Sequence, residues 1–358
     1  MDVAGGRQAP TKTERGLNVL TYIQIILLCV LIMPTGLISC ALTGPAPGDS
    51  SNNILDSSKI FRSKDFIIYE LPAAATPAEL AQRFLGDRTK SWQIVESNPS
   101  AGFNSGDLIV IPLNHFDRGG LHRDGIQTIP ILTYHRFSND CSSPLCVRRS
   151  LFDDQMRYLK ENGFHAISPE QLLAFLDYKA GLPKKSVLIT MDDGYRSAYE
   201  IAYPILKKYG FTATLFIYTN FVGVSKMAIT WDQLKELKAN GFTIGSHTIK
   251  HSDLTMREDG ESDADWKARI EMELHGSKQI LDKKLNQDTI VLAYPYGKYD
   301  KRSITTARKA GYKLAMSVQR GGNPFFADPL YLRRDQILRK DMQTFISRLN
   351  TFKPMSLK

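Results

Sequence analysis

Between residues 129 and 317, short continuous apolar runs alternate with segments whose apolar residues recur at helical spacing. The apolar runs predict strands at residues 129–134, 187–191, 214–218, 242–246, 290–294 and 312–317. The amphipathic segments predict helices at residues 150–163, from 168 onwards, and at 197–209, 230–240, 263–285 and 301–310. Strands separated by helices favour a parallel sheet, and this many repeats favour a closed or nearly closed α/β barrel.

Polar residues mark the starts of three of these helices. Ser150 is predicted to cap the first helix. This helix has Phe152 on its buried face and is predicted to end at Gly163. The sequences that begin at Ser168 and Thr230 both have the capping-box pattern, in which a hydroxyl and a side chain three positions later bond each other's backbone amides.

A smaller pattern precedes the main one at residues 65–113. It predicts a strand, two helices and a strand, at residues 66–69, from 76, around 92–95 and at 108–112. This order, with Asn98 after the second helix, resembles a LysM glycan-binding module. Residues 74–76 (AAT) stand where such modules usually have Gly-Asp-Thr, so a glycan-binding module and a structural spacer both stay open.

The N-terminal 40 residues have the features of a membrane-targeting segment. From Gly16 to Cys40 there is no charged residue and no histidine, and the run at 23–33 is strongly apolar. A stretch of about 20 apolar residues can cross a bilayer, so residues 1–40 are predicted to be a signal peptide or an uncleaved anchor. Residues 37–40 (LISC) resemble the lipobox of bacterial lipoproteins, in which Cys40 would carry the lipid. Either interpretation places the rest of the chain outside the cytoplasm, tethered to a membrane.

The remaining boundaries follow the composition of the chain. Residues 41–64 begin with a stretch rich in Pro, Gly, Ser and Asn and are predicted to be a flexible tether. Residues 114–127 contain three glycines and are predicted to be a linker. Residues 128–352 form the predicted main domain.

The overall composition is that of an ordinary globular protein with a basic excess. Apolar residues make up 42% and charged residues 23% of the 358 residues, which argues against a disordered or polytopic membrane protein. The net charge of +9 suits lipid headgroups or a wall polymer, although a solvated basic surface gives the same value. Beyond this charge the sequence has no sign of nucleic-acid binding, and it identifies no protein partner.

Three of the predicted strands end in residues with ligand or catalytic chemistry. They are followed by Asp192 and Asp193, by His247 and His251, and by residues 293–297 (AYPYG). One carboxylate and two histidines form a ligand set for Zn²⁺ or a similar ion, and the other carboxylate could act as a base. The four-residue spacing would let both imidazoles face one point if the segment makes a helical turn.

In this order, the three motifs resemble those of the NodB-type polysaccharide deacetylases, carbohydrate esterase family four. The resemblance covers residues 127–350. It implies a distorted (β/α)7 barrel and a metal-dependent hydrolysis that removes acetyl groups from N-acetylhexosamine units. The expected architecture is therefore an α/β barrel of this kind, with the small α+β LysM-like module before it.

The resemblance also implies roles for individual residues. It makes Asp192 the general base, and it makes Asp193, His247 and His251 the ligands of a divalent ion. Zinc is the expected ion, with Co or Ni as alternatives.

The remaining site residues are less fixed by the pattern. The resemblance places the backbone N–H of Tyr296, together with Pro295, at the oxyanion. Many family members take the general acid from a late Leu-x-His motif, but no histidine follows His275 here. His135, at the end of the first strand, is the candidate acid, with a structural histidine as the alternative. Arg334 could orient the base or bind sugar, or it could form a structural salt bridge.

Tyr-His-Arg at residues 134–136 and Tyr-Pro-Tyr-Gly at 294–297 resemble the poly-N-acetylglucosamine deacetylases within this family. The predicted function is metal-dependent N-deacetylation of an N-acetylglucosamine-containing polysaccharide, exopolysaccharide or peptidoglycan, at the cell envelope. The predicted partners are an acetylated glycan polymer and, through lipid or an N-terminal helix, a membrane. The alternatives are a non-catalytic glycan-binding envelope lipoprotein and an O-acetyl esterase that acts on xylan-like polymers.

The four cysteines divide by their position in the chain. Cys29 lies in the apolar run, and Cys40 lies in the lipobox-like sequence. Cys141 and Cys146 are expected to pair in an oxidising compartment and to fix the loop after His135, with two free thiols as the alternative.

Overall fold

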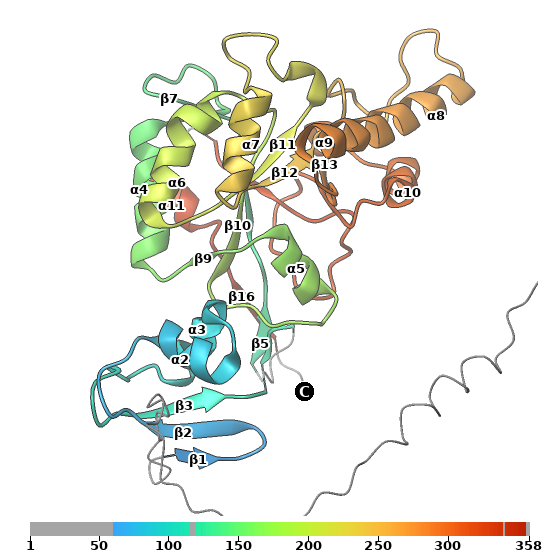
Figure 1. The fold of residues 1–358 in the computed structure, drawn as a ribbon. Helices are drawn as coiled ribbons and strands as arrows, with labels where there is room; N and C mark the ends of the chain where they lie inside the picture. The colour runs from blue at the N-terminus through green and yellow to red at the C-terminus, as the bar shows by residue number, and fades with distance from the viewer. Residues whose placement is uncertain (1–59, 115–118, 123, 339–340, 356–358) are drawn as a thin grey trace, which may run out of the picture. The chain divides into compact units, whose positions relative to one another are not determined.

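The computed structural model describes residues 60–114, 119–122, 124–338 and 341–355 (Figure 1). The predicted anchor with its lipobox, and residues 41–59 of the predicted tether, lie outside the described residues. Within the described ranges, every helix is too short or too polar to cross a membrane.

The small N-terminal unit has the predicted strand–helix–helix–strand order. It contains β2 (Phe66–Glu70), α2 (Pro77–Leu85), α3 (Ser91–Ser97) and β3 (Leu108–Pro112), and a further strand β1 (Ile60–Arg62) that was not predicted. The three strands form an antiparallel sheet in the order β1-β2-β3. Thr76 and Glu79 form the expected capping box at the start of α2.

Asn98 ties the second helix of this unit to its last strand. Its side-chain amide donates hydrogen bonds of 2.7 Å to the carbonyls of Ile94 and Val110, and its Oδ1 accepts one of 2.9 Å from the Val110 N–H. An asparagine at this position therefore satisfies backbone groups of α3 and β3 at once, which an apolar residue could not do.

The main domain is built on a parallel sheet. Its strands are β6 (Ile131–Tyr134), β10 (Ser186–Met191), β11 (Thr214–Ile217), β12 (Thr243–Ser246), β13 (Val291–Ala293), β14 (Leu314–Met316) and β15 (Asp335–Gln336). Their spatial order is β14-β13-β12-β11-β10-β6-β15, and β9 (His165–Ala166) pairs with the start of β10. The six strands predicted from apolar runs are all present, which confirms the alternating α/β pattern.

The segment that carries β15 brings the two edges of this sheet together. Leu332 pairs in parallel with Met316 of β14, and Asp335 pairs with Leu132 of β6. The sheet thereby curls into the distorted barrel that was expected. This segment was not predicted as a strand because it is short and contains Arg-Arg-Asp instead of an apolar run.

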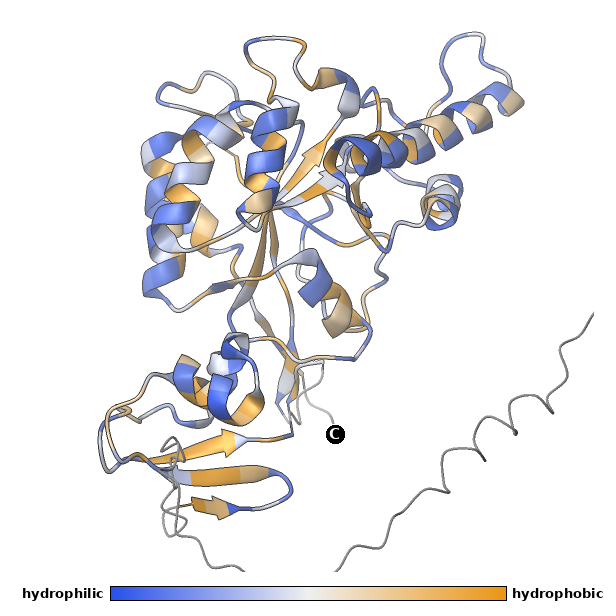
Figure 2. Cartoon of the chain, in the orientation of Figure 1, coloured by the Kyte–Doolittle hydropathy of each residue, from blue (hydrophilic) through white to orange (hydrophobic). Residues whose placement is uncertain are grey.

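Helices pack around the sheet and direct their apolar residues towards it (Figures 1 and 2). They are α4 (Arg149–Glu161), α5 (Pro169–Leu176), α6 (Tyr203–Tyr209), α7 (Trp231–Ala239), α8 (Asp263–Glu271), α9 (Ser277–Leu285), α10 (Lys301–Ala310) and α11 (Met342–Ile346). The capping boxes predicted at Ser168 and Thr230 are both confirmed. The cap predicted at Ser150 is wrong: α4 begins at Arg149 directly after β8 (Cys146–Arg148), so Ser150 already lies in its first turn.

Part of the predicted linker at residues 114–127 forms strands instead. The strands β4 (Leu121–His122) and β5 (Gly125–Gln127) form a three-stranded antiparallel sheet with the C-terminal strand β16 (Phe352–Pro354). A Cβ on Gly125 would collide with the carbonyl oxygen of Lys353, so this glycine permits the close approach of two strands. From the sequence alone this stretch resembles a linker, because it is rich in glycine and because the strand that pairs with it lies at the C-terminal end of the domain sequence.

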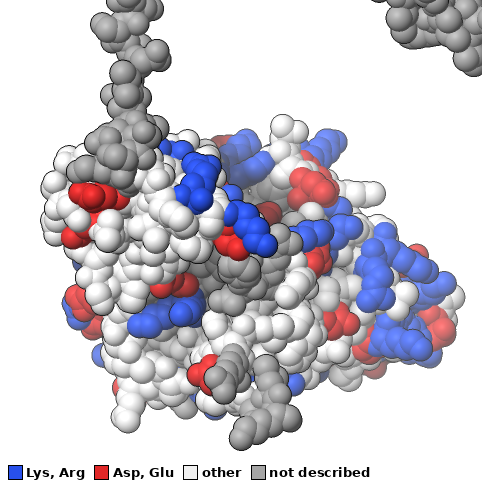
Figure 3. All heavy atoms as spheres, turned by 90° about the horizontal axis from the view of Figure 1, so that it is seen from below, with Lys and Arg blue, Asp and Glu red and all other residues white. Residues whose placement is uncertain are grey.

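The basic side chains do not form one continuous patch on the face shown in Figure 3. Lys and Arg side chains lie there in several groups, with acidic side chains between them. The net charge of +9 is therefore not concentrated on this face.

Phe152 provides a test of the packing between α4 and the sheet. It is completely buried, and its ring contacts those of Tyr134 and Phe137 at centroid distances of 5.1 and 4.6 Å. We expect Phe152→Ala to lower the free energy of unfolding by about 3–5 kcal/mol, because the cavity cannot fully collapse. The matched control is Phe326→Ala, whose ring is 64% exposed and whose loss should change stability by no more than about 0.5 kcal/mol. Urea unfolding measures both values, and equal effects of the two substitutions would contradict this packing.

Candidate functional site

The predicted site residues lie where parallel strands end. Asp192 and Asp193 follow β10, His247 follows β12, and the Tyr294–Gly297 turn follows β13. Because the carboxyl ends of parallel strands meet at one edge of the sheet, residues far apart in the sequence are brought to one place.

Asp193, His247 and His251 form a cluster that could hold a metal ion. The Nε2 atoms of both histidines lie 3.6 Å from Oδ1 of Asp193, and the ligand atoms of all three residues lie within 4.8 Å of one another. Nδ1 of His247 lies 2.7 Å from the carbonyl oxygen of Ala293. A proton on Nδ1 would donate this bond and leave the Nε2 lone pair directed at the cluster, as in most protein metal sites.

The charges of these residues also suit a cation. Burial and the neighbouring Asp192 raise the pKa of Asp193 to about 7, so a positive ion beside this carboxylate would offset both effects. Burial lowers the pKa of His247 to about 3, which keeps the imidazole neutral and able to act as a ligand. Two imidazoles and one carboxylate are a donor set that fits a divalent ion of the zinc type.

The two histidines do not lie on a helical turn, so helical spacing is not what brings their rings together. The segment after β12 is a loop in which Thr248 has φ +71° and His251 has φ +62°. Positive φ is unfavourable for residues with a Cβ, and most of all for β-branched ones. These turns nevertheless bring the two imidazoles together, with ring centroids 4.6 Å apart.

Arg334 holds Asp192 in place beside this cluster. The side chain of Arg334 is completely buried, and its two terminal nitrogens donate hydrogen bonds of 2.7 and 2.8 Å to the two oxygens of Asp192. Its Nε donates to the carbonyl oxygen of Ser317 at 2.8 Å. Burial is the largest single effect and would raise the pKa of Asp192. The charge and hydrogen bonding of Arg334, together with His247 and His135, outweigh it, and the pKa falls to about 2. Of the two functional roles considered for Arg334, this geometry matches orienting Asp192, because no part of the side chain reaches solvent.

The turn after β13 presents an unpaired backbone amide. Tyr296 has φ +58°, and no described residue accepts a hydrogen bond from its N–H group. Its ring is 59% exposed and lies edge-on to that of His251 at 4.6 Å. Pro295 is buried, and a Cβ on Gly297 would collide with Val318, so these two residues shape the turn.

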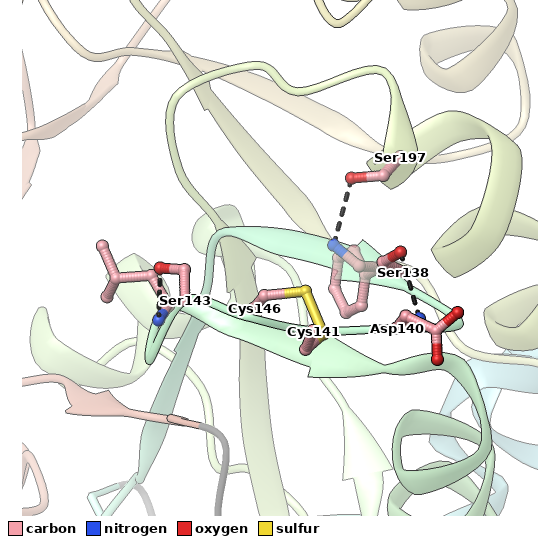
Figure 4. The surroundings of a disulfide bond; sticks show 8 residues. Ser138, Asp140, Cys141, Ser143, Cys146 and Ser197 are labelled. Carbon is pink, nitrogen blue, oxygen red and sulfur yellow. Dashed lines mark hydrogen bonds between the residues drawn. A yellow bond between two sulfur atoms is a disulfide. The ribbon is translucent and has the colours of Figure 1, made fainter.

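His135 lies at the end of β6, half-buried near the same charges. Burial lowers the pKa of His135, and the negative charge of Asp192 opposes this shift. The loop that follows is closed by the Cys141–Cys146 disulfide, which confirms the predicted pairing (Figure 4). The Phe137 N–H also donates a hydrogen bond of 3.1 Å to Ser197 Oγ, so the chain after His135 is fixed at two points.

Two contributors to the site were not found from the sequence. Tyr218, which follows β11, lies with its ring centroid 5.5 Å from that of His251, and its position after a strand was the signal that could have found it. Glu273 lies within a helical segment and accepts hydrogen bonds from the histidine loop. A glutamate in an amphipathic helix gives no such signal in the sequence.

Comparison with known families matches residues 179–315 to the family described as polysaccharide deacetylase. The chain is 34% identical over 193 residues to Bacillus subtilis YxkH, named as a candidate polysaccharide deacetylase, and the match covers 54% of this chain and 65% of YxkH. It is 29% identical over 211 residues to a poly-beta-1,6-N-acetyl-D-glucosamine N-deacetylase of Staphylococcus aureus (strain MRSA252), covering 58% of this chain and 72% of that protein. Among solved structures, it is similar to the Streptococcus pyogenes deacetylase PplD in complex with acetate. That likeness has a TM-score of 0.57 and 32% identity, and it covers 62% of this chain and 98% of PplD.

The barrel and these homologues define an enzyme of the hydrolase class. The chain belongs to the polysaccharide deacetylase family, because it covers nearly the whole of PplD at 32% identity. It spans 65% of the length of YxkH.

Replacing Arg334 should show what its ion pair contributes. We expect Arg334→Met to lower the free energy of unfolding by about 3–5 kcal/mol, because it leaves Asp192 as a buried charge without its partner. Arg333→Met is the matched control, since Arg333 is exposed and its substitution should change stability by no more than about 0.5 kcal/mol. Both values come from urea unfolding at neutral pH, and a stable Arg334→Met protein would argue against the buried pair.

Proposed function

We propose that this protein is a metal-dependent hydrolase that removes acetyl groups from N-acetylglucosamine units of a polysaccharide. The observation that carries this proposal is the cluster of Asp193, His247 and His251 beside a second carboxylate, Asp192, which Arg334 fixes. One carboxylate is thus available to a cation, and the other is held separately, with Oδ2 of Asp192 4.0 Å from Nε2 of His247.

The residues of the cluster would hold the ion, and Asp192 would act as the base. A divalent ion held by Asp193, His247 and His251 would polarise the acetyl carbonyl and lower the pKa of the attacking water. Arg334, with His247 and His135, lowers the pKa of Asp192 to about 2 against the effect of burial. Asp192 is therefore ionised at neutral pH and can accept the proton of that water. Zinc is the ion that we propose first, because two imidazoles and a carboxylate suit it, with Co²⁺ and Ni²⁺ as alternatives.

Two further groups complete the proposed reaction. The unpaired N–H of Tyr296 would donate a hydrogen bond to the developing oxyanion. The leaving amine needs a proton, because an unprotonated amine is a poor leaving group. We assign this step to His135, which lies near Asp192 and outside the ligand cluster.

The substrate that we propose first is a β-1,6-linked N-acetylglucosamine polymer, with peptidoglycan as the alternative. The named activity of the Staphylococcus aureus relative supports this choice, as does the match over 72% of its length. The exposed ring of Tyr296 beside His251 also offers an apolar face on which a sugar ring could pack.

We further propose an extracytoplasmic, membrane-tethered location, with the small N-terminal unit as a LysM-like glycan-binding module. The Cys141–Cys146 disulfide supports the location, because such bonds persist mainly in oxidising compartments. The β2-α2-α3-β3 order and the role of Asn98 support the module. The charge-free stretch up to Cys40, which lies outside the described residues, supports the tether.

Acetate release from a panel of polymers tests the proposed activity. The panel contains β-1,6-linked poly-N-acetylglucosamine, peptidoglycan and acetylxylan, each with metal-free protein to which Zn²⁺, Co²⁺ or Ni²⁺ is added back. Release from either amide-linked polymer supports the proposal. Release from acetylxylan alone would indicate an O-acetyl esterase, and polymer binding without any release would indicate a glycan-binding protein.

His247→Ala tests the metal cluster. We expect it to weaken metal binding by more than about 100-fold and to abolish acetate release. Loss of a residue that only orients a ligand weakens binding by up to about 100-fold, and loss of the ligand itself should cost more. The matched control is His165→Ala, because His165 pairs beside Ser186 at the opposite end of β10 from Asp192. Metal content after dialysis and acetate release are measured for both, and full activity of His247→Ala without bound metal would refute the mechanism.

A further inference from the structure

A buried carboxylate lies directly behind the histidine loop. Glu273 is only 3% exposed, and one of its oxygens accepts hydrogen bonds of 2.8 and 2.9 Å from the consecutive N–H groups of Ile249 and Lys250. These two residues lie between His247 and His251. The carboxylate thus contacts the centre of the segment that joins the two imidazoles.

The helix that carries Glu273 is locally distorted at this point. Between α8 and α9, residues Met272–Gly276 form a π-helical turn, a rare feature that often marks functional sites. A Cβ on Gly276 would lie 2.8 Å from Cδ1 of Ile249, so the π-helical turn packs closely against the loop. The wide turn and the small residue together let the carboxylate reach the backbone of the loop.

The loop needs such support because its conformation is unfavourable. Thr248 and His251 both have positive φ, and conformations of this kind persist only where the surroundings enforce them. One end of the loop is held by the bond from the Thr248 N–H to Ser246 Oγ, at 3.1 Å. The middle of the loop is held by Glu273, because one of its oxygens accepts hydrogen bonds from two consecutive N–H groups.

We propose that Glu273 is a positioning residue that holds the loop in the shape in which His247 and His251 can bind one ion together. This inference rests on the proposed function, since it takes these histidines to be metal ligands. The carboxylate acts through hydrogen bonds to the backbone, so the length of the Glu273 side chain matters more for metal binding than its charge.

Two conservative substitutions separate the effect of side-chain length from the effect of charge. Glu273→Gln keeps the length of the side chain and an oxygen that can accept both N–H groups, but it removes the charge. Glu273→Asp keeps the charge but is one methylene shorter. We expect Glu273→Asp to weaken metal binding about 10–100-fold, as the loss of partners that orient ligands does, and Glu273→Gln to stay within about 10-fold of the wild type.

The measurements are Zn²⁺ affinity by competition with a chromophoric chelator and the visible absorption spectrum of the Co²⁺-loaded protein, which reports ligand geometry. Urea unfolding of each metal-free variant shows whether it is folded. Glu271→Asp is the matched control, because Glu271 is exposed on the same helical segment and should leave affinity and spectrum unchanged.

The outcomes are distinct. A folded Glu273→Asp protein with wild-type affinity and spectrum would overturn the inference. Tight binding by Glu273→Asp together with weak binding by Glu273→Gln would indicate a charge effect and would also overturn it. Equal weakening of binding by both substitutions would overturn it as well. Failure of the proposed function is seen separately. If the wild-type protein binds metal and His247→Ala does not, but the wild-type protein releases no acetate, the proposed activity is refuted. The metal-binding measurements on the Glu273 variants then still test this inference.

Discussion

The buried ion pair between Arg334 and Asp192 is the interaction on which the rest of the site depends. Two adjacent carboxylates at one strand end would disfavour each other's charge once both are removed from water. Arg334 donates two hydrogen bonds to Asp192, and Asp193 lies with the two histidines instead. The guanidinium therefore separates two chemically identical side chains into different environments, which is the condition for giving them different roles.

The same arginine links the site to the closure of the barrel. Its backbone belongs to the segment that pairs with β14 at Leu332 and with β6 at Asp335. Its side chain crosses the interior to Thr190 and Asp192 at the end of β10, and it also bonds the carbonyl oxygen of Ser317 after β14. The ion pair thus forms only when the last strand has joined the first, so the site is completed together with the fold.

The site also collects several unfavourable backbone conformations. Asp193, Thr248, His251 and Tyr296 all have positive φ. Conformations of this kind tend to gather at functional sites, where packing and hydrogen bonds hold them. The hydrogen bonds from the loop to Glu273 are one example of this stabilisation. Glu273 belongs to a helical segment that contributes no residue to the ligand cluster.

The six strands built from apolar runs, and the chemistry at their ends, could be predicted from the sequence. A strand buried on both faces leaves a continuous apolar run, and the polar residues that follow it stand out against that run. It also indicated the Cys141–Cys146 pair from the short separation and the expected compartment. The other features depend on how distant parts of the chain fold together. The closing strand is polar and short, so its pairing depends on neighbours far along the chain. The choice of Asp192 as the partner of Arg334 and the support from Glu273 are contacts between distant segments, and such contacts leave no periodic signal in the sequence.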